Sequence, residues 1–244
     1  MKPFVLLASR AEDQAADDEY EQVLRFGGLD ESMLHRVRME AGPLPHLDPD
    51  RLSGVIVGGS PFDASTPQEA KSAVQVRVEG EMSALLDRLV PLDFPFLGAC
   101  YGVGTLGRHQ GGTIDRTYAE EIGAVRVSLT DEGRRDPLLA DLPDQFDAFV
   151  GHKEACRVLP PTATLLASSP TCPVQMFRVR RNLYATQFHP ELDVDGISTR
   201  IRVYGGYGYY APDEQEQVLA RVGAADVWAP PLVLAAFVER YRRR

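Results

Sequence analysis

The sequence predicts an α/β protein with a mostly parallel central sheet and helices on both faces. Two observations lead to this class. Short, nearly continuous apolar runs alternate with longer stretches whose apolar residues recur at helical spacing. Several of the short runs also end in glycine-containing turns. A chain of 244 residues with a hydrophobic fraction of 44% is long and apolar enough for one large domain of this kind.

In the first half of the chain, strands and helices are expected in alternation. The acidic helix after the first strand closes at Gly27 and Gly28, a typical C-terminal cap. The second strand alternates apolar and charged residues, which indicates a less buried position. In order, we expect a strand over 4–8, a helix over 12–26, strands over 33–39 and 54–57, a helix over 73–89, a strand over 96–99 and a helix over 102–109.

The second half is expected to hold shorter strands, followed by a helical segment. The strands are separated by proline-containing turns. Each helix of the last segment has an apolar stripe that needs cover, so we expect it to pack on the preceding domain. The predicted strands cover 124–129, 146–150, 164–167, 174–179 and 183–188, the helices cover 197–203, 213–222 and 231–241, and the domain boundary divides 1–195 from a helical extension over 196–244.

Cys100 stands where a strand meets a helix, with Gly98 two residues before it and Gly102 two residues after it. This pattern is typical of a nucleophile elbow, a sharp turn that exposes one side chain above the sheet. We expect that neither glycine position has room for a Cβ atom. The positive N-terminus of the following helix would favour the thiolate form of Cys100. A buried structural cysteine in a tight turn is the alternative.

Two further stretches favour the catalytic interpretation. His189 and Glu191 follow a strand-like run in Phe-His-Pro-Glu, as a base and an orienting carboxylate would. A second apolar strand runs into Gly58-Gly59-Ser60-Pro61, where a turn can aim N–H groups at an oxyanion. Of the five histidines, only His189 has a carboxylate beside it in such a motif.

The cysteine elbow, Gly-Gly-Ser-Pro and Phe-His-Pro-Glu together resemble the class I (triad) glutamine amidotransferases over about residues 3–193. The likeness is strongest to the amidotransferase domain of GMP synthase and its stand-alone relatives, which include γ-glutamyl peptidases. It implies the class I amidotransferase fold and a catalytic triad of Cys100, His189 and Glu191.

The same resemblance implies the remaining site residues. Backbone N–H groups of Gly59 and Tyr101 would hold the oxyanion, and Ser60, Gly104, Gly151 and His152 would contact the substrate. Members of the family usually carry glutamine four residues after the nucleophile, where this chain has Gly104. The missing side chain would weaken the grip on glutamine or make room for a larger substrate.

The expected function is hydrolysis of the γ-amide of L-glutamine through a γ-glutamyl thioester. The ammonia would pass to an unknown acceptor or to a synthetase partner protein. Two alternatives remain open: a γ-glutamyl peptidase or related thiol hydrolase with the same triad, and a non-catalytic regulatory subunit. Release of ammonia from glutamine would distinguish the first function from these alternatives.

Composition narrows the possible partners and cofactors. The net charge of −9 argues against nucleic acid and an anionic membrane surface as partners. Three cysteines without paired spacing favour a reducing compartment, so we expect a cytoplasmic protein. Cys156 and Cys172 lack the spacing of a zinc site with His152, and no phosphate loop is present, so no metal or other cofactor is expected.

Overall fold

The computed structural model of the protein describes residues 2–243 and alternates strands with helices through its first half. The strands are β1 (Phe4–Ala8), β2 (Leu34–Arg38), β3 (Gly54–Val57), β4 (Phe96–Ala99), β5 (Thr113–Asp115), β6 (Glu120–Leu129), β7 (Gln145–His152), β8 (Ala155–Val158), β9 (Ala163–Ser168), β10 (Met176–Val179) and β11 (Leu183–Thr186). The α-helices are α1 (Asp13–Gly27), α2 (Ala73–Leu89), α3 (Tyr101–His109), α4 (Asp131–Arg135), α5 (Val194–Val203), α6 (Gln215–Gly223) and α7 (Pro230–Tyr241).

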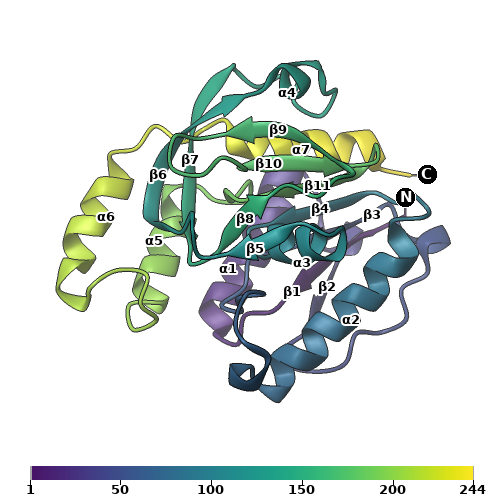
Figure 1. Ribbon diagram of the computed structural model, residues 1–244, viewed down its shortest axis with the longest axis horizontal. Helices are drawn as coiled ribbons and strands as arrows, with labels where there is room; N and C mark the ends of the chain where they lie inside the picture. Colours follow the sequence, from purple (N-terminus) through teal and green to yellow (C-terminus); the bar gives the residue numbers. More distant parts are fainter. Residues whose placement is uncertain (1, 244) are drawn as a thin grey trace.

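A nine-stranded sheet with the order β2-β1-β3-β4-β11-β10-β9-β6-β7 forms the centre of the molecule (Figure 1). The first five strands of this order pair in parallel, and the others join antiparallel. A small second sheet pairs β5 with β8. This architecture confirms the predicted α/β class, and it gathers the carboxyl ends of β3, β4 and β11 at one edge.

The sheet separates two hydrophobic cores, because successive side chains of a strand point to opposite faces. Phe4 and Leu6 of β1 pack in the core that contains residues of α1 and α7. Val5 and Leu7 pack in the core that contains residues of α2 and α3. Both faces of the parallel strands are therefore covered by helices, as the continuous apolar runs predict.

The predicted bounds agree with the structure for β1, β3, β4 and α2, and other elements shift by a few residues. The sequence pattern does not predict β5, β8 or α4. β5 and α4 are only three and five residues long, and β8 follows two buried residues with the exposed Arg157 and Val158, so it has no continuous apolar run. None of the helices in the described residues is long and apolar enough to cross a membrane.

The last three helices pack on the rest of the chain. α7 lies against α1, and its Phe237 contacts Phe4 with ring centroids 6.1 Å apart. α5 and α6 form a third apolar cluster with β6 and β7, in which Ile197 and Val222 meet Ile122 and Phe149. The division of the chain at residue 195 stays a prediction, but the packing of this segment on the sheet and α1 is clear in Figure 1.

Candidate active site

Cys100 lies in the turn between β4 and α3 with φ 50° and ψ −82°. A positive φ is disfavoured for a residue with a side chain, so the turn is held by its surroundings. The Cys100 N–H donates to the Thr186 carbonyl at 2.7 Å, which ties the turn to β11. This is the sharp strand-to-helix turn that the sequence predicts.

The two glycines that flank Cys100 differ in their surroundings. A Cβ atom at Gly98 would lie 2.6 Å from the Gly102 Cα atom, so the close approach of β4 and α3 requires glycine at position 98. A Cβ atom at Gly102 would meet no atom within 4 Å. The steric expectation is confirmed for Gly98 and wrong for Gly102.

The register of the sheet brings the two sequence motifs together. β4 and β11 are parallel neighbours, with Ala99 opposite Thr186, so the residues that follow each strand lie at the same edge. Cys100 and His189 line one cavity, together with Ser60 from the turn after β3. The His189 N–H donates to the Phe149 carbonyl at 3.0 Å, which fixes the histidine from the β7 side.

His189 and Glu191 form a buried pair, with the imidazole Nδ1 donating to Glu191 Oε1 at 2.8 Å. This bond leaves Nε2 as the ring nitrogen without a partner among the described residues. Burial lowers the pKa of His189, and Arg200 adds to the effect while Glu191 opposes it. Burial would raise the pKa of Glu191, but His189 and Arg200 outweigh it and hold that pKa well below its usual range.

The surroundings of Cys100 favour the thiol over the thiolate. Burial raises the pKa of Cys100 to about 12, although the positive charges of Arg10 and Arg200 oppose this rise. The expected thiolate-favouring effect of the helix N-terminus is therefore outweighed by desolvation. Nucleophilic attack by this sulfur requires a base to remove its proton.

Two buried arginines, Arg10 and Arg200, line the cavity together with His189, and no sequence motif indicates them. Arg200 of α5 donates through Nη2 to Glu191 Oε1 at 2.9 Å and to Glu19 Oε1 at 3.2 Å, and its Nη1 lies 2.9 Å from His189 Nδ1. Arg10 donates through Nε to Glu19 Oε1 at 3.0 Å. Both guanidinium groups therefore have carboxylate partners, and the pairs connect α1 and α5 to His189.

The two predicted oxyanion donors differ in their availability. Tyr101 opens α3, where backbone N–H groups have no acceptor within the helix. The Gly59 N–H instead donates to Glu19 Oε1 at 3.2 Å. The next N–H, that of Ser60, has no acceptor among the residues that the structure describes, and Ser60 lines the cavity with Cys100. The assignment of Gly59 stays a prediction, with Ser60 as the adjacent available donor.

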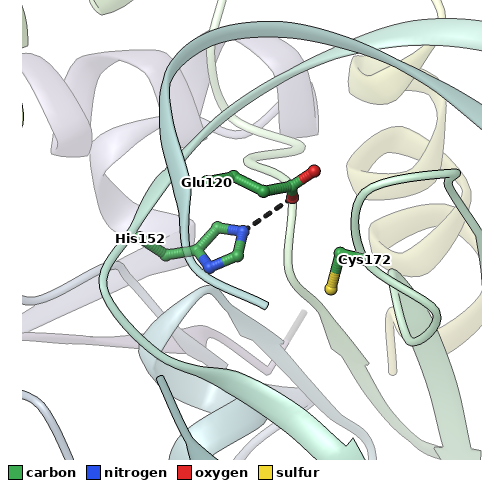
Figure 2. A group of neighbouring side chains, drawn as sticks. All are labelled: Glu120, His152 and Cys172. Atoms are coloured by element: carbon green, nitrogen blue, oxygen red, sulfur yellow. Dashed lines mark hydrogen bonds and ion pairs between the residues drawn. The ribbon is translucent and has the colours of Figure 1, made fainter. Parts of the chain in front are cut away.

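The side chain of His152 is engaged away from Cys100, in a buried cluster with Glu120 and Cys172 (Figure 2). Its Nε2 lies 2.8 Å from Glu120 Oε2, and its Nδ1 lies 2.9 Å from the Glu154 carbonyl oxygen. Glu120 also accepts a bond from Gln175 at 2.8 Å. The nitrogen and oxygen atoms that could hold a metal are thus bonded to one another, which argues for a structural role.

The four predicted substrate contacts, Ser60, Gly104, Gly151 and His152, line one cavity with Cys100. The space beside Gly104 is filled, since a Cβ atom there would lie 2.7 Å from Glu154 Oε1. The expectation that glycine at this position makes room for a larger substrate is therefore wrong. Gln187 also lies here, with its Nε2 3.8 Å from the Cys100 sulfur.

Solved structures of other proteins have the same fold as this chain. A glutamine amidotransferase of Thermotoga maritima superposes with a TM-score of 0.77 at 19% identity, covering 99% of this chain and 98% of that one. A glutamine amidotransferase of Methylobacillus flagellatus gives a TM-score of 0.71 at 18% identity, covering 100% of this chain and 97% of that one. At such low identity these likenesses show the fold alone.

Curated relatives include GMP synthases. One subunit of the glutamine-hydrolysing GMP synthase of Thermococcus kodakarensis is 27% identical over 172 residues, which are 70% of this chain and 81% of that relative. The GMP synthase of Aeropyrum pernix is 26% identical over 232 residues, 91% of this chain but only 40% of that enzyme. The sequence model of glutamine amidotransferase class-I matches residues 35–199, which include Cys100, His189 and Glu191. The chain therefore belongs to the class I glutamine amidotransferase family.

Proposed function

We propose that this protein hydrolyses the γ-amide of L-glutamine. The observation that carries the proposal is the common cavity of Cys100, on its sharp turn, and His189, whose imidazole is paired with a buried carboxylate. Nucleophile, base and orienting group are the three parts that thiol-dependent amide hydrolysis needs. Membership of the amidotransferase family supports the same reaction.

In the proposed mechanism, His189 Nε2 takes the thiol proton as the Cys100 sulfur attacks the amide carbon. Glu191 holds the Nδ1 proton and stabilises the imidazolium that forms. The Tyr101 N–H, together with that of Ser60 or Gly59, stabilises the oxyanion. His189 then returns its proton to the leaving nitrogen, ammonia departs, and water cleaves the γ-glutamyl thioester to give glutamate and the free thiol.

A γ-glutamyl peptide is the second candidate substrate. The cavity on the Arg10 side of Cys100 has an aromatic and apolar lining, which includes Tyr204, Tyr209 and Ile197. Such a lining suits an organic leaving group better than ammonia. The triad and its chemistry would be the same, and only the amine released from the thioester-forming step would differ.

We also propose a synthetase as the consumer of the ammonia. The relative from Thermococcus kodakarensis is named as one subunit of a GMP synthase, and the relative from Aeropyrum pernix is a GMP synthase of which this chain matches only part. A protein partner that supplies the acceptor site is therefore the simplest arrangement for this chain.

The test compares ammonia released from L-glutamine with glutamate released from a γ-glutamyl dipeptide. Glutaminase activity that disappears in Cys100→Ala supports the proposal. Turnover of the dipeptide alone favours the peptidase. An active-site thiol that turns over neither substrate, with or without an added synthetase, contradicts both and leaves the regulatory subunit.

A further inference from the structure

The space beside Cys100 is too small for a glutamine molecule. Cys100 lines two neighbouring cavities, one on the side of Arg10 and one on the side of Glu154. The volume that the centres of water molecules can occupy is about 30 Å³ in the first cavity and about 10 Å³ in the second. Such volumes hold no more than a few water molecules, since one water needs roughly 10–15 Å³ on the same scale. A substrate therefore reaches the sulfur only after part of the cavity wall has moved.

Tyr209 forms a wall between these cavities and a much larger cleft. The volume open to the centres of water molecules in the cleft is about 500 Å³. Tyr209 lines both cavities at Cys100 and also the cleft, which Lys153 and Arg116 line as well. Burial raises the pKa of Tyr209, and the nearby Cys100 adds to the rise. Displacement of this one side chain would join the narrow cavities to the cleft.

The segment that carries Tyr209 has a backbone suited to movement. It connects α5 with α6 (Figure 1) and contains three glycines, at positions 205, 206 and 208. Gly208 has a φ of 77°, and a Cβ atom at Gly206 or Gly208 would meet no atom within 4 Å. Packing therefore leaves the dihedral angles free to change at these positions. Loops that open and close over active sites bend at a few residues, which are often small.

The two ends of this segment are fixed. The Tyr204 hydroxyl accepts a bond from Arg10 Nη1 at 3.1 Å and donates to Glu12 Oε2 at 3.1 Å. At the other end, the Tyr210 hydroxyl donates to a backbone carbonyl of α5. These bonds confine the movement to residues 205–209, which include Tyr209.

Lys153 holds the middle of the segment. Its Nζ donates to the Tyr207 carbonyl at 2.7 Å and lies 4.6 Å from the centre of the Tyr209 ring. A charged hydrogen bond and a cation–π contact both stabilise this position of the ring. Because Lys153 belongs to the turn between β7 and β8, these contacts tie the segment to the opposite side of the cleft.

We propose that Tyr209 is a gate between Cys100 and the cleft, and that Lys153 holds this gate closed. Opening of the gate admits the γ-glutamyl substrate. Because the segment is fixed at both ends, the opening is limited, and the gate favours glutamine over γ-glutamyl peptides with larger leaving groups. This preference rests on the proposed function, whereas access to the thiol does not depend on it.

The experiment labels Cys100 of the full chain with N-ethylmaleimide and with the much larger fluorescein maleimide. Mass spectrometry of the peptide that contains Cys100 gives both rates, and the large reagent should react far more slowly with the wild type. In Tyr209→Ala and in Lys153→Met, the rate with the large reagent relative to the small one should rise about tenfold, as expected when about 1.4 kcal/mol that favours the closed gate is lost. A changed thiol pKa would alter both rates alike, so the ratio measures access.

Two variants serve as controls for these substitutions. Lys153→Arg keeps the charge and the donor, so its ratio should stay close to that of the wild type. Tyr207→Ala removes a ring from the same segment but keeps the carbonyl that Lys153 binds, and Tyr207 lines neither cavity at Cys100. An unchanged ratio in Tyr209→Ala, an equal rise in Tyr207→Ala, or a wild type that reacts equally fast with both reagents would overturn the gate. An unchanged ratio in Lys153→Met would overturn the role of Lys153.

Steady-state kinetics test the substrate preference separately. Tyr209→Ala should raise kcat/KM for a γ-glutamyl dipeptide relative to kcat/KM for L-glutamine, with glutamate release as the readout. If this ratio does not change while the labelling ratio does, Tyr209 controls access but does not select by size. If the wild type turns over neither substrate, the proposed function fails, and the labelling rates still decide whether Tyr209 is a gate.

Discussion

Buried charges lie on both sides of Cys100, and the two sides differ in how those charges are compensated. On one side, Arg10 and Arg200 share the carboxylate of Glu19, and Arg200 also pairs with Glu191. On the other side, Glu154 has only backbone N–H partners. The first arrangement pairs each arginine with a carboxylate, whereas the second holds a buried carboxylate through backbone N–H groups without a cation from the described residues.

This difference separates charged groups that are paired with one another around His189 from a carboxylate that backbone N–H groups hold. A buried ion pair costs much of its Coulomb energy in desolvation, and its main effect here is to fix the position of His189. A buried carboxylate without a cation raises the free energy of the folded state. Substitutions can test the two sides and the chemistry between them, from the largest effect to the smallest.

The largest effect is expected at the sulfur itself. Cys100→Ala should abolish turnover and covalent labelling, because no other thiol lies in the cavity with His189. Cys156→Ala and Cys172→Ala should remain active, since both thiols are buried elsewhere. Activity is measured as ammonia or glutamate release. Undiminished labelling of the Cys100→Ala protein would show that the wrong cysteine has been assigned.

His189→Ala should reduce kcat by about 10²–10⁴-fold, the usual contribution of a general base. Glu191→Gln should lose less, because this side chain orients the imidazole without touching the substrate. Rates are measured at saturating substrate over a range of pH. If His189→Ala stays active while His152→Ala is inactive, the base is the other histidine.

Arg200→Gln removes the guanidinium group that pairs with Glu19 and Glu191. It should lower the free energy of unfolding by about 3–5 kcal/mol, the usual cost of removing one member of a buried ion pair. Because Arg200 lowers the pKa of His189, its removal should also move the acidic limb of the rate profile to higher pH. Denaturant unfolding and the pH dependence of kcat/KM measure the two effects. Arg200→Lys keeps the positive charge, so a limb shifted equally in this variant would argue against a charge effect.

The smallest effect is the contribution of His189 to the pH dependence of stability. Its pKa is lowered in the folded protein, so the unfolded chain binds a proton more readily as the pH falls. The contribution of His189 to the free energy of unfolding is therefore complete above the ordinary histidine pKa of about 6.5, and it is lost as the pH falls below that value. Denaturant unfolding at pH 7.5 and pH 5.5 should therefore show a smaller loss of stability in His189→Asn than in the wild type. An identical loss in both proteins would contradict this assignment.

The elements that position the chemistry can be predicted from the sequence because burial leaves a clear pattern. The strands β1, β3 and β4 are short runs buried on both faces, and α2 has apolar residues at helical spacing. The cysteine turn and the histidine segment then follow neighbouring strands. The family resemblance adds the triad, and the comparisons support membership of the chain in the amidotransferase family.

The buried charged residues around the cavity cannot be predicted from the sequence pattern. Glu19 is buried in the same acidic helix as the exposed Asp17, and Arg200 is buried two residues before the exposed Arg202. Nothing in the local pattern distinguishes these residues, because their partners lie far away in the sequence: Glu19 and Arg200 are 181 positions apart. The position of Glu154 cannot be predicted either, since the local sequence does not show that its carboxylate lies beside Gly104.

The backbone conformation of Cys100 lowers the stability of the folded protein, although the proposed activity requires a cysteine at this position. An L-residue with φ 50° and ψ −82° raises the free energy of the folded state by about 1–3 kcal/mol, which packing elsewhere in the domain must offset. Glycine adopts positive φ freely, so a Cys100→Gly protein would be relieved of this strain. Selection for thermal stability alone would therefore favour loss of the nucleophile, and only selection for turnover keeps a sulfur at this position.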